Sequence, residues 1–125
     1  MQDEPTSAEI LRAVSLFMRG SEPGRIRKYD LLVASNALDL IGRQLEGQGA
    51  ANLAEMTRLE ALLDRSGSLE ELNRALCEAI RSAPYGELKR YAEHLLQTTL
   101  EKLAIDQPTY STFVEYSARM DTELS

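Results

Sequence analysis

The sequence has very few histidine and cysteine residues, the side chains that hold zinc or form a disulfide. It contains one cysteine, Cys77, and one histidine, His94. A single cysteine cannot form an internal disulfide, and one thiol with one imidazole supplies too few ligands for an ordinary four-coordinate zinc site. We therefore expect neither an internal disulfide nor a bound metal.

Positive charge and long apolar runs are also scarce. The 14 Lys and Arg residues are outnumbered by 20 Asp and Glu residues, which gives a net charge of -6, spread along the chain. A protein surface that binds nucleic acids or an anionic membrane needs clustered positive charges. No apolar run approaches the roughly 18 residues that span a bilayer, and the acidic first ten residues lack the apolar segment of a signal peptide. We expect a cytoplasmic protein without nucleic-acid or membrane partners.

The motifs of common catalytic sites are missing as well. Neither of the phosphate-binding patterns GxGxxG and GxxxxGK[ST] occurs, and the nucleophile motif GxSxG is absent. His94 lies in a segment rich in Glu, Lys and Gln, which is typical of a half-exposed surface residue. Cys77 follows Leu76 and is typical of a small buried packing group. We assign no catalytic residue and no cofactor.

What is present is helical periodicity. No segment shows the alternating β-branched pattern of a strand, and 125 residues suit one domain. We therefore predict an all-α, single-domain bundle of about five helices over residues 1–125. Its core is expected over about 5–106, and residues 107–125 are expected to form a C-terminal tail or a short sixth helix.

Capping signals and breaks define the five expected helices. Capping boxes at Thr6 and Ser68 predict two helix starts, and the 47–49 Gly-Gln-Gly triplet predicts a helix end. The expected helices run from Thr6 to about Gly20, from the break at residues 20–24 to Gly47, over about 51–63, from Ser68 to the break at 83–86, and over about 87–104. Short turns favour antiparallel neighbours.

The segment from Ile26 to Leu45 is apolar on almost every side, with Asn36 at its centre. A helix with that pattern is expected at the hub of the bundle, where Asn36 would need hydrogen-bond partners and Gly42 would mark a close helix contact. Asn73 and Lys102 also lie on otherwise apolar helix faces. Two interpretations stay open for the three polar residues: a hydrogen-bond network that sets helix register, or a ligand site between facing helices.

Two further features are candidates for binding. Arg25, Arg27 and Lys28 form a local cationic cluster at a helix start, where the macrodipole disfavours cations. The cluster is either a solvated helix start or a site for a phosphate, a carboxylate or an acidic partner surface. The last 17 residues contain three aromatics, Tyr110, Phe113 and Tyr116. This tail either folds back on its own domain or packs on another subunit or partner.

Four blocks of the sequence carry a resemblance to a known family: PTSAEIL at 5–11, LVASNAL at 32–38, LNRALC at 72–77 and EKLAIDQPTY at 101–110. In this order and spacing they resemble the bacterial domain-of-unknown-function family 6285, with one departure at Gln107, where the family pattern has Asn before Pro. The family has no assigned activity, so the resemblance implies no catalytic residues. It implies a context beside aminoglycoside-kinase-like phosphotransferases and acyl-CoA dehydrogenases, and hence a helper in acyl catabolism.

These observations support two hypotheses. The first is a non-catalytic helical accessory protein that binds a phosphotransferase-like or acyl-CoA-handling enzyme through an exposed apolar face. The second is a small-molecule module that binds an acyl-CoA or a hydroxy acid near Asn36, Asn73 and Lys102, with phosphates on the cationic cluster. A homodimer is compatible with both.

Overall fold

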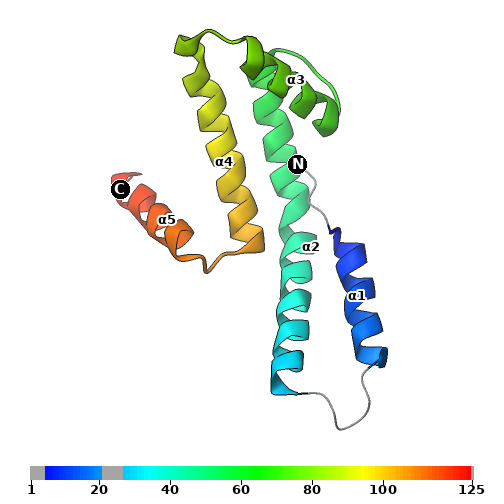
Figure 1. Ribbon diagram of the computed structural model, residues 1–125. Coiled ribbons are helices and arrows are strands. Elements are labelled where there is room, and N and C mark those ends of the chain that lie inside the picture. The colour runs from blue at the N-terminus through cyan, green and yellow to red at the C-terminus, as the bar shows by residue number, and fades with distance from the viewer. Residues whose placement is uncertain (1–4, 21–26, 125) are drawn as a thin grey trace. The chain divides into compact units, whose positions relative to one another are not determined.

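The computed structural model describes residues 5–20 and 27–124, and within them every regular element is a helix (Figure 1). This confirms the all-α class. No helix in the described part of the chain is both long enough and apolar enough to cross a membrane. The elements are α1 (Ser7–Gly20), α2 (Lys28–Leu63), α3 (Leu69–Ser82), the short 3-10 helix η1 (Tyr85–Glu87), α4 (Leu88–Asp106) and α5 (Ser111–Leu124).

The two helix starts predicted at Thr6 and Ser68 are confirmed, and so is the predicted end near residue 63. Ser68 accepts a hydrogen bond from the Glu71 amide at 3.1 Å while the Glu71 carboxylate accepts from the Ser68 amide at 3.2 Å, which completes a capping box. The Thr6 hydroxyl accepts from the Glu9 amide at 3.2 Å at the start of α1. The end of α2 is set by Asp64, whose φ of 52° is the left-handed conformation that closes many helices.

The predicted break at residues 47–49 is wrong, because α2 continues through it as one helix. A helical glycine costs only about 1 kcal/mol relative to alanine. Residues 28–63 contain no proline, so no backbone donor is lost on either side of the glycines. The two helices expected on either side of this break are therefore one helix. The described residues still form five α-helices, because α5 forms where a tail or short sixth helix was expected.

The chain divides into two compact units, and their boundary falls inside α2. We call residues 2–48 the N-terminal unit and residues 49–125 the C-terminal unit. The core of the C-terminal unit is formed by Leu59, Leu72, Leu76 and Tyr91, which come from α2, α3 and α4. Leu59 and Leu72 are fully buried there.

The N-terminal unit is an antiparallel hairpin of α1 and the first part of α2 (Figure 1). The Ser7 hydroxyl donates to Gln44 Oε1 across the hairpin. Among the described residues of this unit, Ile41 is the one buried residue. The predicted hub is therefore wrong: Asn36 is exposed, and no atom outside the neighbouring backbone lies within 4 Å of a Cβ placed on Gly42. A hairpin offers each helix one neighbour, so only one stripe of the apolar segment is covered.

The C-terminal tail forms helix α5, which contacts α4. Phe113 and Tyr116 are partly buried, whereas Tyr110 is exposed just before the helix begins. No residue of α5 within 111–124 is fully buried. The tail thus forms a helix that contacts α4 of its own unit, with two of its three aromatic side chains partly buried.

Candidate functional site

The buried face of α4 is a polar stripe. His94, Thr98 and Glu101 follow one another at spacings of four and three residues, which places them on one side of the helix. His94 and Thr98 are buried, and so are Tyr91 and Ile105 at the two ends of the stripe. Three polar side chains therefore occupy the positions that a bundle helix ordinarily gives to apolar residues.

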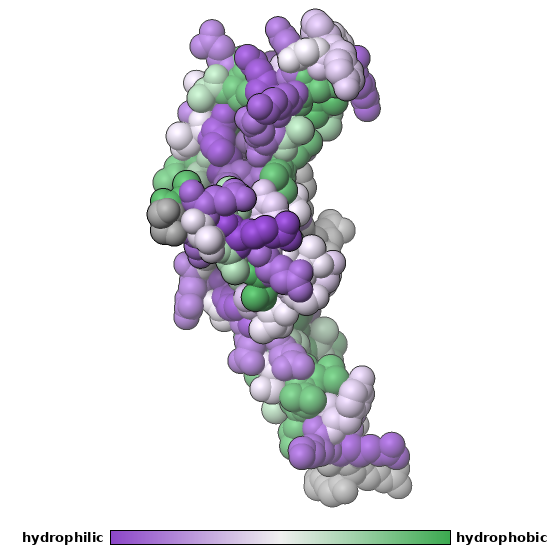
Figure 2. Space-filling view, turned by 90° about the vertical axis from the view of Figure 1, so that its left-hand side faces the viewer, coloured by the Kyte–Doolittle hydropathy of each residue, from purple (hydrophilic) through white to green (hydrophobic). Residues whose placement is uncertain are grey.

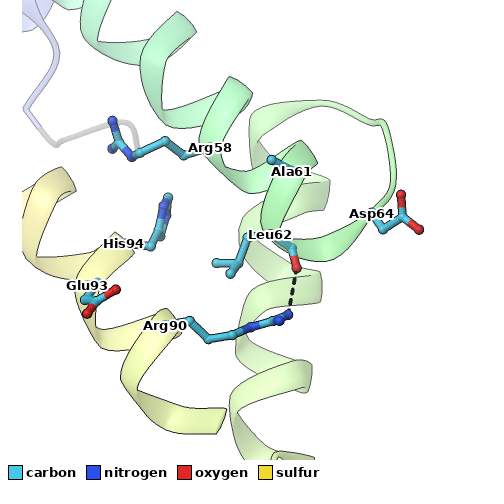
Figure 3. Close-up of a pocket in the computed structure, with 7 residues that line it drawn as sticks. All are labelled: Arg58, Ala61, Leu62, Asp64, Arg90, Glu93 and His94. Atoms are coloured by element: carbon cyan, nitrogen blue, oxygen red, sulfur yellow. Dashed lines mark hydrogen bonds between the residues drawn. The ribbon is translucent and has the colours of Figure 1, made fainter.

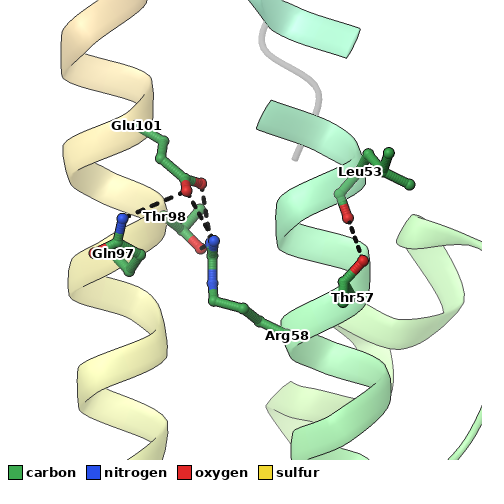
Figure 4. A network of polar contacts seen from close by, with 6 residues as sticks. All are labelled: Leu53, Thr57, Arg58, Gln97, Thr98 and Glu101. Atoms are coloured by element: carbon green, nitrogen blue, oxygen red, sulfur yellow. Dashed lines mark hydrogen bonds and ion pairs between the residues drawn. The ribbon is translucent and has the colours of Figure 1, made fainter. Parts of the chain in front are cut away.

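Arg58 on α2 is the partner of this stripe (Figure 4). Its Nη1 and Nη2 donate to the two Glu101 carboxylate oxygens at 2.8 and 3.0 Å, and Nη2 also donates to the Thr98 hydroxyl at 3.0 Å. The side-chain amide nitrogen Nε2 of Gln97 donates a longer hydrogen bond to Oε1 of Glu101 at 3.4 Å. A bidentate guanidinium–carboxylate pair is directional, so it holds α2 and α4 of the C-terminal unit in one register.

His94 is a titratable group whose pKa the surroundings shift. It is 6% exposed, and this burial, followed by the nearby Arg58 cation, lowers its pKa from the ordinary value of 6.5, although Glu55 and Glu101 oppose the shift. The imidazole is therefore neutral at pH 7. Its Nδ1 atom is buried without a hydrogen-bond partner among the described residues, and the same is true of Nε of Arg58.

A second polar contact joins α2 to α3. Glu55 is buried, and its Oε2 accepts a hydrogen bond from Nδ2 of Asn73 at 2.9 Å. The same Asn73 nitrogen also donates to the Leu69 carbonyl at 3.0 Å. Asn73 is thus part of a hydrogen-bond network between helices, the first of the two interpretations left open by the sequence.

An open pocket of about 700 Å³ lies beside Arg58 and His94 (Figure 3). In this view the His94 ring points from α4 toward the Arg58 side chain on α2. Arg90 forms another side of the pocket and donates a hydrogen bond to the Leu62 carbonyl at 3.1 Å. Its positive charge also interacts favourably with the negative end of the helix dipole at the C-terminus of α2. The remaining lining residues are Ala61, Leu62, Asp64 and Glu93.

The pocket is lined largely by polar and charged side chains. The guanidinium groups of Arg58 and Arg90 can donate hydrogen bonds, the carboxylates of Asp64 and Glu93 can accept them, and the neutral imidazole of His94 can do both. Within residues 5–20 and 27–124, no group of three or more His, Cys, Asp or Glu side chains is arranged to hold a metal ion. Cys77 is exposed on α3, which corrects its predicted burial, and the burial of His94 corrects its predicted exposure.

The residues predicted as binding sites lie in both units. In the N-terminal unit, Arg27 and Lys28 are exposed at the start of α2, where the Arg27 amide donates to Asp30 at 3.1 Å; Arg25 lies outside the described residues. Asn36 is exposed farther along α2. In the C-terminal unit, the structure places Asn73 next to Glu55, Lys102 half-buried on α4, Tyr110 exposed and Phe113 half-buried. The binding roles assigned to these residues stay predictions.

The second candidate site is the apolar surface of the N-terminal unit. No residue of α1 is buried, and large apolar side chains are exposed along both helices of the hairpin. Figure 2 shows hydrophobic atoms at the surface in the lower part of the view, where Figure 1 places the first turns of α2. The exposed large apolar residues of this unit are Leu11, Leu16, Phe17, Met18, Tyr29, Leu31, Leu32, Val33, Leu38 and Leu45.

Sequence reasoning missed the Arg58 network because it followed the leucines of α4. Leu95, Leu96 and Thr99 of α4 are exposed. The signal that could have revealed the buried face is the spacing of His94, Thr98 and Glu101 between Tyr91 and Ile105. Nothing in that spacing identifies the partner on α2, which lies some forty residues earlier in the chain.

Comparison with known proteins gives one match. The family model described as Domain of unknown function (DUF6285) matches residues 23–110. The match includes three of the four sequence blocks that carry the resemblance, and the first block, at 5–11, precedes it. No curated protein and no solved structure matches.

Proposed function

The chain belongs to DUF6285, a family of unknown function, and we propose that it is a non-catalytic interaction protein that binds another protein chain through the apolar surface of its N-terminal unit. The observation that carries this proposal is the burial pattern of that unit. Ile41 is buried, while ten large apolar residues of the same hairpin are exposed. Large apolar side chains left exposed in this number are typical of a protein that has an interaction surface.

The energetic argument follows from what the hairpin leaves in water. Full burial of a leucine, phenylalanine or methionine side chain stabilises a protein by roughly 1.5 to 3 kcal/mol relative to leaving it exposed. Leu16, Phe17 and Met18 at the end of α1 are three consecutive exposed residues of this type. A partner that covers them gains more free energy per unit area than one that binds the charged surface around them.

The class of partner follows from the family resemblance. It is an aminoglycoside-kinase-like phosphotransferase or an acyl-CoA dehydrogenase, for which this chain would serve as an accessory in acyl catabolism. Arg27 and Lys28 are exposed at the start of α2, beside the apolar surface. Their positive charges would complement an acidic surface on the partner.

The test is direct binding to the purified enzymes from the same organism, followed by biolayer interferometry. The Leu16→Asp/Phe17→Asp double variant is expected to lose at least tenfold in affinity. Leu96→Asp is the matched control, because Leu96 is an exposed leucine on α4 in the other unit. Binding by neither enzyme, or equal affinity for the double variant and the control, contradicts the proposal.

One observation favours a second candidate function, a small-molecule module. Arg58 Nε is a buried donor and His94 Nδ1 a buried potential acceptor, both without partners among the described residues, and both residues line the pocket. A hydroxyl group can accept from the first and donate to the second. Such a group is present in a hydroxy acid, one of the two ligand classes that the sequence suggested, the other being acyl-CoAs.

His94 makes this candidate simple to test, because the only histidine of the chain gives a single set of imidazole signals in an NMR spectrum. Titration with hydroxy acids and with acyl-CoAs is expected to shift those signals, and His94→Gln is expected to weaken binding. Unchanged imidazole signals with every ligand would exclude the pocket as the binding site.

A further inference from the structure

The pocket beside Arg58 and His94 offers a ligand one buried donor and one buried acceptor. Nε of Arg58 can only donate a hydrogen bond, and Nδ1 of the neutral His94 imidazole can accept one. Both atoms are buried, and neither has a hydrogen-bond partner among the described residues. Both side chains line the pocket (Figure 3). Because a buried polar atom without a partner costs free energy, the two atoms favour a ligand group that can both donate and accept, such as a hydroxyl.

Arg90 adds further hydrogen-bond donors from α4. Its Nη2 donates to the Leu62 carbonyl at 3.1 Å, and its Cζ atom lies 5.3 Å from the centre of the Tyr91 ring. These two contacts position the guanidinium at the wall of the pocket. None of the ion pairs among the described residues includes Arg90. A guanidinium carries more N–H donors than these contacts use, so the others can donate to a ligand.

The charges of the pocket are balanced. Its charged lining residues are two arginines, Arg58 and Arg90, and two acids, Asp64 and Glu93. An anionic ligand would face both carboxylates and a cationic ligand would face both guanidinium groups, whereas an uncharged ligand avoids both repulsions. A molecule with several hydroxyl groups suits this lining, because each hydroxyl can accept from an arginine and donate to a carboxylate or to His94.

We propose that this pocket binds an uncharged polyhydroxylated molecule, a sugar or a polyol, whose hydroxyl groups bond to Arg58, His94 and Arg90. The proposal rests on the second candidate function, the small-molecule module, and extends its ligands beyond hydroxy acids and acyl-CoAs. The cavity volume of about 700 Å³ is in the range of small-molecule sites, roughly 300 to 1,000 Å³. Ala61 and Leu62 also line the pocket and give the C–H surface of such a ligand an apolar contact.

Sugars that share one ring skeleton and differ in charge test the proposal. The full chain is titrated at pH 7 with glucose, glucuronate and glucosamine, and with the corresponding galactose set, while the imidazole NMR signals of His94 are followed. The neutral sugar of a set is expected to shift these signals and to bind about fivefold more tightly than its charged counterparts, because it avoids like charges in the pocket. Tighter binding of a charged sugar overturns the proposal, and so does the absence of a shift with both neutral sugars.

Two arginine variants separate the pocket from the rest of the surface. Arg90→Met removes donors of the pocket and is expected to weaken sugar binding about fivefold, the effect of losing one hydrogen bond. Arg74→Met is the matched control, because Arg74 is an exposed arginine on α3 of the same unit that does not line the pocket. Circular dichroism checks that both variants are folded. Equal affinities of the two variants contradict the proposed site.

A third variant tests the charge balance itself. Glu93→Gln removes one negative charge from the pocket but keeps an oxygen acceptor. It is expected to tighten glucuronate binding about threefold and to leave glucose binding unchanged. A glucuronate affinity that does not change would show that the charge of the lining does not select the ligand.

The outcomes separate this inference from both proposed functions. Binding of an enzyme through Leu16 and Phe17 uses the N-terminal unit, so it stands or fails independently of the pocket. If hydroxy acids or acyl-CoAs shift the His94 signals and the neutral sugars do not, this inference ends and the small-molecule module remains. If no ligand of any of these classes shifts them, both end together.

Discussion

The Arg58–Glu101 pair is expected to contribute several times more to stability than an ordinary surface ion pair. Its two hydrogen bonds measure 2.8 and 3.0 Å, and the side chains are only 26% and 25% exposed. The chain supplies its own reference in Arg74 and Glu70, which pair at 3.3 Å with exposures of 71% and 85%. Both are arginine–glutamate pairs, and they differ in that the first is half-buried and the second is exposed to water.

A double-mutant cycle measures the two coupling energies. Each hydrogen bond to a charged group is worth roughly 1.5 to 3 kcal/mol when partners are removed, and desolvation of the two charges offsets much of the sum. We expect a coupling of about 1.5 kcal/mol between Arg58→Met and Glu101→Met. For Arg74→Met and Glu70→Met, exposure and salt screening limit the coupling to about 0.3 kcal/mol.

The assay is urea denaturation followed by far-ultraviolet circular dichroism, on the four single variants, the two double variants and the unmodified chain. Methionine keeps the length of the side chain and favours a helix, so the change in propensity is small. Equal coupling energies in the two cycles would refute the reasoning, because they would mean that burial adds nothing to the Arg58 pair. Repetition at high salt should reduce the exposed pair more than the half-buried one.

Three further predictions follow from burial and helix geometry. The NMR signals of His94 should titrate below pH 6.5, because burial and then Arg58 lower its pKa. Between the lowered pKa and 6.5 the unfolded chain binds more protons than the folded chain, so the free energy of unfolding is highest above pH 6.5 and falls as the pH drops toward the lowered pKa. His94→Gln should abolish this fall. Leu72→Ala should lower the free energy of unfolding by about 3 kcal/mol, since Leu72 is fully buried. Gly49→Ala should raise it by about 0.7 kcal/mol, because α2 is helical there and a Cβ meets nothing within 4 Å; a loss of stability would show that α2 is interrupted.

Local signals in the sequence predicted much of the secondary structure. The capping box at Ser68 depends on two residues three apart, and both of its hydrogen bonds are present. The break after α3 and the end of α4 depend on Pro84 and Pro108, whose effect on the preceding backbone is also local. Interactions of this range are encoded in adjacent residues, and a single sequence is sufficient to find them.

Burial was predicted less well, because it depends on which helices are neighbours. The apolar segment 26–45 has the composition of a hub, yet it belongs to a two-helix unit that covers one of its stripes. On α4 the leucines at 95 and 96 are exposed, and the face with His94 and Thr98 is buried. Arg58 offsets part of the free-energy cost of burying these polar side chains. Its partner Glu101 lies 43 residues away in the sequence. No periodicity within one helix contains this information.

The two departures from the usual pattern have different consequences for function. Burial of the polar side chains of α4 costs free energy. The bidentate contact of Arg58 with Glu101 offsets part of that cost and fixes the register between α2 and α4 of the C-terminal unit. The exposed leucines at 31, 38 and 45 of α2 have no such compensation within the described residues. Apolar side chains that stay exposed gain free energy only when something covers them, so covering this surface would add stability that the hairpin alone does not supply.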